Sequence, residues 1–139
     1  MLRIIAIMNQ KNHYLEKFYS LNENELLNFS KQNFDGLEEF YQTREKILEM
    51  VKYLDSEIDK TQSLVDTSLS LEEKQDLREA LAIKDEYVNR ILSQDLQILS
   101  CIEKAKSNII RELQDMRRSR RAMGSYKSGR TDHRLDEEA

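Results

Sequence analysis

The residue types that perform catalysis or bind metal ions are few and scattered in this sequence. His13 and His133 lie near opposite ends of the 139 residues, and neither has a partner at metal-ligand spacing beyond a chance pair. Cys101 is the one cysteine, so the sequence offers neither an intrachain disulfide nor a cysteine-based zinc site. We also find no Gly-rich phosphate loop and no nucleophile elbow. The sequence therefore predicts a protein that is not an enzyme and that uses no metal or cofactor.

The remaining candidate chemistry is electrostatic. Residues 1–116 carry 15 basic and 22 acidic side chains, a net charge of −7, whereas residues 117–134 carry seven basic and one acidic, a net charge of +6. The run Arg117-Arg118-Ser119-Arg120-Arg121 has the chemistry to bind phosphates or an acidic protein, or to complement the dipole at a helix C-terminus. Because the body of the protein is acidic, we expect an acidic protein or the dipole rather than nucleic acid.

The composition favours helices as the elements that position these residues. Hydrophobic residues make up 39% and charged residues 35% of the chain, with no proline and only three glycines. We expect helices over residues 4–30, 35–65 and 71–123, followed by a flexible tail over residues 124–139. Ser70 and Glu73 form the capping box of the third helix, and Gly124 is its expected C-terminal stop.

Apolar spacing predicts how these helices pack. Apolar side chains recur at intervals of three and four in the second helix, and at intervals of seven in the third. Short connectors make successive helices antiparallel, so facing residues of the second and third helices should have numbers that sum to roughly 136. The expected fold is all-α: an antiparallel helical hairpin or three-helix bundle with one very long C-terminal helix. The residues in these rows are Leu37, Phe40, Ile47, Val51, Leu54, Ile58 and Val65, and then Leu81, Val88, Ile102, Ile109, Met116 and Met123.

This register leaves the end of the third helix without a partner in its own chain. The uncovered part carries an apolar row that we name the C-terminal stripe: Ile102, Ile109, Ile110, Leu113 and Met116. A large uncovered apolar row indicates a protein interface. It has three explanations: a break near Ser107-Asn108 that folds the segment back as a fourth helix, a homodimer contact, or a groove for a partner's helix.

Two charged residues lie in rows that otherwise hold apolar side chains. Arg44 occupies such a position in the second helix, and Asp95 lies between Val88 and Ile102 in the third. The antiparallel register brings their positions within one turn of each other. We therefore predict a partly buried structural ion pair that sets the register more than it adds stability.

Three segments together carry a resemblance to a known family. The first is Phe-Asp-Gly-Leu-Glu-Glu-Phe at residues 34–40 with Thr-Arg-Glu-Lys-Ile-Leu at residues 43–48, and the second is the long acidic and aliphatic last helix. The third is Arg-Arg-Ala-Met-Gly-Ser-Tyr-Lys-Ser-Gly at residues 120–129. With these segments the chain resembles the flagellar type III export chaperones of the FliT-like and FlgN-like kind. The resemblance implies a cytoplasmic chaperone that shields an amphipathic helix of a filament-cap or hook–filament-junction protein and delivers it to the export ATPase and gate.

The same resemblance maps the client groove onto the C-terminal stripe and export-gate docking onto Tyr126. The alternative function is a constitutive coiled-coil structural or adaptor protein in which the stripe forms a homodimer seam. The apolar run at residues 4–8 is too short for a signal peptide, and no stretch approaches the roughly 20 apolar residues of a membrane span. We therefore expect a cytoplasmic protein without membrane insertion.

Overall fold

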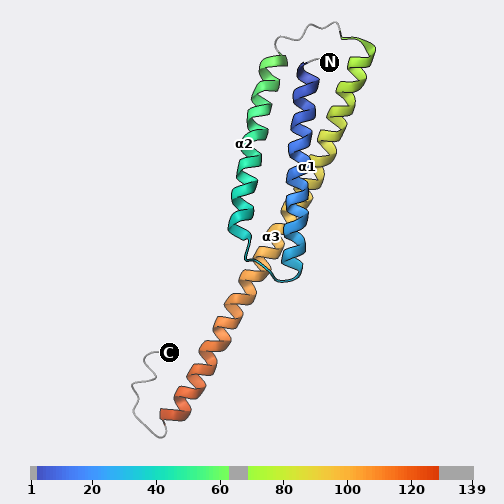
Figure 1. Cartoon of the computed structure of the whole chain (residues 1–139). Helices are drawn as coiled ribbons and strands as arrows, with labels where there is room; N and C mark the ends of the chain where they lie inside the picture. Colours follow the sequence, from blue (N-terminus) through green and yellow to red (C-terminus); the bar gives the residue numbers. More distant parts are fainter. Residues whose placement is uncertain (1–2, 63–68, 129–139) are drawn as a thin grey trace. The chain divides into compact units, whose positions relative to one another are not determined.

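The computed structural model describes residues 3–62 and 69–128, with side chains described as far as Gly124. These residues form three helices, α1 (Arg3–Ser30), α2 (Leu37–Gln62) and α3 (Leu71–Ser128), shown in Figure 1. The protein is all-α, as the sequence predicts. The chain divides into two units between Leu99 and Ser100. We call the described part of residues 1–99 the bundle and residues 100–128 the C-terminal unit.

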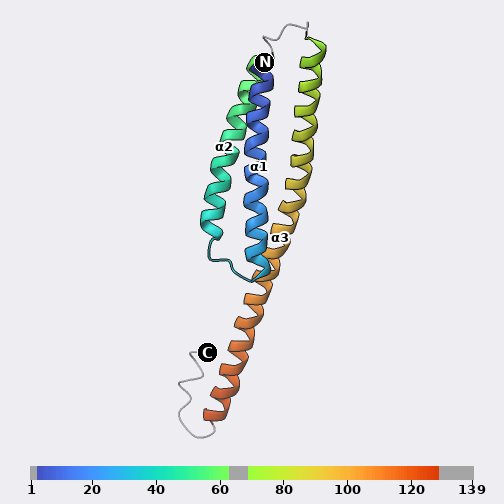
Figure 2. The ribbon, with the colours of Figure 1, turned by 45° about the vertical axis from the view of Figure 1, so that its right-hand side comes forward.

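The bundle packs α1, α2 and residues 71–99 side by side (Figures 1 and 2). One core cluster joins Ile4, Ile5 and Met8 of α1 to Ala80 of α3. Burying an aliphatic side chain of this size contributes roughly 1.5–3 kcal/mol, so the apolar start of the chain is part of the fold. A second cluster centres on Leu15, Phe18 and Ile91, with Ile47, Val51 and Val88 packed against it.

Side-chain contacts give the register of the bundle. Asn12 Nδ2 donates to the Ala80 carbonyl at 3.0 Å, and Asn22 Nδ2 donates to Gln94 Oε1 at 3.0 Å. Helices α1 and α3 therefore run parallel with an offset of about 70 residues, whereas α2 is antiparallel to both. With this offset, the last residue of α1, Ser30, corresponds to Ser100. The bundle thus ends near Leu99, and not after Met123 as the sequence-based boundary has it.

Helix α1 ends in a C-capping motif that contains no glycine. The Asn33 N–H donates to the Asn28 carbonyl at 2.9 Å, and the Gln32 N–H donates to the Phe29 carbonyl at 2.9 Å. This is the Schellman arrangement, in which Gln32 takes a left-handed conformation with φ of 59°. Stacking of Phe34 on Phe29, with ring centroids 4.8 Å apart, holds the reversed chain against the helix.

Helix α2 begins slightly later than expected. The Phe40 N–H donates to the Gly36 carbonyl at 2.9 Å, so Gly36 is the N-cap and the helix starts at Leu37. The Asn33 side chain is used locally, because its Oδ1 accepts from the Asp35 N–H at 3.0 Å. At its other end α2 is described as far as Gln62, and the expected end at residue 65 lies outside the described residues.

Helix α3 begins as the sequence predicts and ends later. Ser70 Oγ accepts from the Glu73 N–H at 3.1 Å, and Glu73 Oε1 accepts from the Ser70 N–H at 3.1 Å. This reciprocal pair is the capping box. The expected stop at Met123 is wrong, because α3 continues to Ser128. Among the described glycines none has a positive φ, so Gly124 keeps a helical backbone, at a cost of about 1 kcal/mol relative to alanine.

Candidate partner-binding surface

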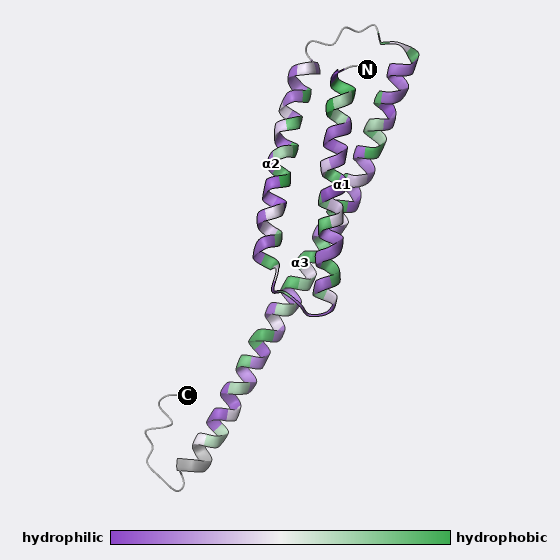
Figure 3. Ribbon diagram, in the orientation of Figure 1, coloured by the Kyte–Doolittle hydropathy of each residue, from purple (hydrophilic) through white to green (hydrophobic). Residues whose placement is uncertain are grey.

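Most of the C-terminal stripe is exposed. Ile109, Ile110, Leu113 and Met116 keep between 50% and 56% of their side-chain surface accessible, whereas Ile102 is half-buried. Figure 3 shows hydrophobic positions (green) recurring between hydrophilic ones (purple) along this part of α3. Four large apolar side chains exposed within eight residues form an apolar patch of the kind that marks interaction sites.

The stripe is narrow. At about 100° of rotation per residue, Ile102, Ile109, Leu113 and Met116 fall within an arc of about 60° on the helix. Ile110 lies about 60° to one side of Leu113 and widens the apolar face there. A narrow row at intervals of three, four and seven residues matches the seam that one helix presents to another, as in coiled coils. The stripe therefore fits a partner helix.

The basic run beside the stripe does not lie at a helix terminus. Arg117, Arg118, Arg120 and Arg121 are all exposed, and Arg121 lies seven residues before the last helical residue. The dipole interaction falls off within the last turn of a helix, so little of this charge serves to complement it. An acidic partner for this run stays a prediction. Arg118 approaches Asp115 at 3.9 Å.

Tyr126, the expected site of export-gate docking, lies within the last turn of α3 rather than in a tail. Its side chain is outside the described residues, as is His133. Residues 129–139, most of the expected flexible tail, are also outside them.

Arg44 and Asp95 meet across the α2–α3 seam, at the position that the antiparallel register predicts. Arg44 Nη2 lies 2.8 Å from Asp95 Oδ1, with the two side chains 16% and 39% exposed. The Arg44 guanidinium also lies over the rings of Phe18 and Phe40, 4.8 and 5.3 Å from their centroids. These contacts hold the cation between two aromatic faces and a carboxylate, an arrangement that fixes the rotation and axial position of α2.

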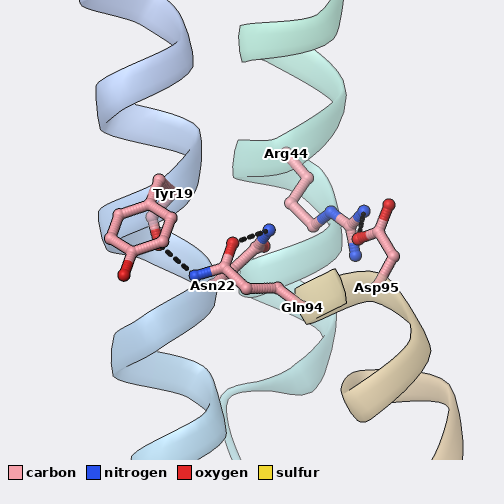
Figure 4. A network of polar contacts seen from close by, with 5 residues as sticks. All are labelled: Tyr19, Asn22, Arg44, Gln94 and Asp95. Atoms are coloured by element: carbon pink, nitrogen blue, oxygen red, sulfur yellow. Dashed lines mark hydrogen bonds and ion pairs between the residues drawn. The ribbon is translucent and has the colours of Figure 1, made fainter. Parts of the chain in front are cut away.

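A buried amide network beside this pair was not predicted from the sequence. Asn22 is fully buried, and Figure 4 shows its side chain meeting that of Gln94. Gln94 Nε2 donates in turn to the Tyr19 carbonyl at 3.1 Å and to Glu23 Oε1 at 2.8 Å. The only signal in the sequence was Asn22 itself, which interrupts the apolar face of α1. The network is structural, because it joins α1 to α3 at a single register.

An apolar groove on the bundle was also missed. It encloses about 90 Å³ and is lined by side chains from all three helices: Leu15, Phe18, Leu48, Val51, Val88, Ile91 and Leu92. Leu92, Leu96 and Leu99, at spacings of four and three, remain 56–71% exposed on α3. The spacing of these three leucines can be read from the sequence. Only the packing of α1 and α2 shows that they stay exposed while Ile91 and Ile98, on the neighbouring side of α3, are buried.

Within residues 3–62 and 69–128, no three His, Cys, Asp or Glu side chains are arranged to hold a metal ion. No helix in the same ranges combines the length and apolarity needed to cross a membrane. No protein-family model, curated protein or solved structure matches the chain.

Proposed function

We propose that this protein is a cytoplasmic export chaperone of the flagellar type. Its C-terminal stripe binds an amphipathic helix at the end of a late flagellar subunit, either a filament-cap or a hook–filament-junction protein. The observation that carries the proposal is the exposed, narrow apolar row of Ile109, Leu113 and Met116 on a helix that Arg117–Arg121 make basic. Covering such a row removes apolar surface from water in both partners.

In this function the chaperone keeps the client's helix from assembling or aggregating before export. The bundle acts as the rigid part, held by the Arg44–Asp95 pair and the Asn22–Gln94 contact. Delivery then requires a contact with the export ATPase and gate, for which Tyr126 is the candidate on the grounds of the resemblance. No catalytic step and no nucleic acid take part.

The experiment is a pull-down from the native cytoplasm with the intact chain and with Ile109→Asp/Leu113→Asp. Ser107→Asp/Asn108→Asp is the matched control, because both positions are exposed and add the same charge on the side of α3 away from Ile109 and Leu113. We expect the intact chain and the control to capture a flagellar cap or junction protein, and Ile109→Asp/Leu113→Asp not to capture it. Equal capture by all three proteins contradicts the proposal.

The second candidate is a constitutive homodimer that uses the same stripe. The interval of seven residues between Ile102, Ile109 and Met116 favours it, because this is the repeat of a coiled-coil seam. Sedimentation equilibrium distinguishes the two functions. A monomer that gains mass only with client supports the chaperone, whereas a stable dimer that Ile109→Asp/Leu113→Asp dissociates supports the structural protein.

A further inference from the structure

Three basic side chains border the C-terminal stripe. Lys106 is four residues after Ile102 and three before Ile109. Arg117 is four residues after Leu113, and Arg120 is four residues after Met116. Residues three and four apart are neighbours on a helix surface, so these cations lie against the apolar row. Lys106 and Arg120 continue the three-and-four spacing of the row, and Arg117 lies beside it. Charges within and beside such a seam influence the choice of partner where two helices pack.

These cations have no ion-pair partner among the described residues. The salt bridge within residues 100–124 joins Arg118 to Asp115, away from the stripe. This segment carries seven basic and three acidic side chains, a net charge of +4. Lys106, Arg117 and Arg120 therefore present unneutralised positive charge beside exposed apolar surface.

We propose that the occupant of the stripe is a partner's amphipathic helix whose apolar seam is bordered by Asp and Glu side chains facing Lys106, Arg117 and Arg120. This inference rests on the proposed function, and it adds the chemistry by which the client is selected. The apolar contact holds the complex, and the charges steer association and reject helices with basic borders.

The other occupants match the surface less well. A second copy brings its own segment of charge +4 against this one, so like charges oppose assembly at this seam. A lipid surface is bound by helices with a broad apolar face that includes Trp, Phe or Leu, whereas this row is narrow and residues 100–124 contain no aromatic side chain. Nucleic acid makes no use of the apolar row.

The test measures binding of the full chain to two synthetic amphipathic helices of about four heptads, one with Glu and one with Lys bordering the same Leu/Ile seam. The variant Lys106→Glu/Arg117→Glu reverses two of the bordering charges. Its matched control, Lys104→Glu/Arg111→Glu, changes the net charge equally. Lys104 and Arg111 lie two residues from Ile102 and Ile109, a spacing that does not place side chains on one face.

We expect the acidic helix to bind the intact chain, with affinity that weakens as salt rises from about 0.05 to about 0.5 M. Lys106→Glu/Arg117→Glu should weaken this binding about tenfold and bind the basic helix instead, whereas the control should change binding about twofold or less. Three results would overturn the inference: equal losses in both variants, equal binding of the two peptides, or binding of neither. So would binding to phosphatidylglycerol vesicles, or self-association of the chain, that the acidic peptide does not displace.

The outcome is separable from that of the proposed function. If a flagellar subunit is captured through Leu113 and the Lys106→Glu/Arg117→Glu variant captures it equally well, the charge inference fails and the chaperone stands. If the acidic helix binds as expected but no flagellar subunit is captured, the chaperone of flagellar type fails and the selectivity of the stripe stands.

Discussion

Replacing Arg44 by Met and Asp95 by Leu, singly and together, measures what the charged pair across the α2–α3 seam contributes to folding. Two unit charges with centres about 4 Å apart attract each other by about 4 kcal/mol at an effective dielectric constant of about 20. Desolvation of Arg44, which is 16% exposed, and solvent screening of Asp95, which is 39% exposed, offset most of this. We therefore expect a net coupling energy of about 1–2 kcal/mol.

The two single variants should differ in cost. Met at position 44 still packs against Phe18 and Phe40 and leaves Asp95 in contact with water, so Arg44→Met should lower the free energy of unfolding by about 1 kcal/mol. Asp95→Leu leaves a largely buried guanidinium without its anion and should cost about 2–3 kcal/mol. The double variant removes both charges and should cost about 1–2 kcal/mol less than the sum of the two.

The assay is urea unfolding of the four proteins, followed by tyrosine fluorescence because five of the six tyrosines lie in residues 1–99. A coupling energy below about 0.4 kcal/mol would show that the two side chains act independently. That result would refute the interpretation that this pair specifies the register of α2 against α3.

Three further predictions concern single positions. Burial raises the pKa of the Glu25 carboxyl, and a hydrogen bond from Asn28 offsets part of this rise. Folding therefore favours the protonated form, and the free energy of unfolding falls as the pH rises through the raised pKa. Glu25→Gln should be more stable than the parent in urea unfolding at neutral pH, with the difference shrinking in acid; a constant difference contradicts this. Gln32→Gly should raise the free energy of unfolding by about 0.5–1 kcal/mol, because glycine adopts a φ of 59° without strain. A lower free energy of unfolding, measured with urea, would show instead that the Gln32 side chain is needed. Gly124→Ala should strengthen the helix by about 1 kcal/mol, read from NMR secondary shifts over residues 120–128; weaker helical shifts would indicate that Gly124 acts as a C-cap.

The features that the sequence alone determined are those with short-range or periodic causes. The capping box at Ser70 and Glu73 joins residues three apart, so its geometry follows once the helix starts there. The apolar intervals determined the helical class and the antiparallel register. That register was accurate enough to pair Arg44 with Asp95, because a period near 3.6 residues specifies which side of a helix faces inward.

The same register predicted an apolar row near the end of α3 without a partner in its own chain. Ile109, Leu113 and Met116 of this row are exposed. The identity of its partner rests on the resemblance and on charge, which remain proposals.

What only the tertiary structure decided depends on contacts that periodicity and local propensity do not specify. Asn22 interrupts an apolar face, and only the parallel offset of α1 and α3 shows that its side-chain N–H donates to Gln94. The end of α1 was set by the stacking of Phe34 on Phe29, which compensates a left-handed Gln32 that local propensity disfavours. Gly124 is a different case, because it has the residue type of a helix stop but the helix continues through it to Ser128, on a stretch whose apolar side chains are exposed. At Gln32 a local preference of about 1–2 kcal/mol is outweighed by packing, and packing is read only when the chain segments are placed together.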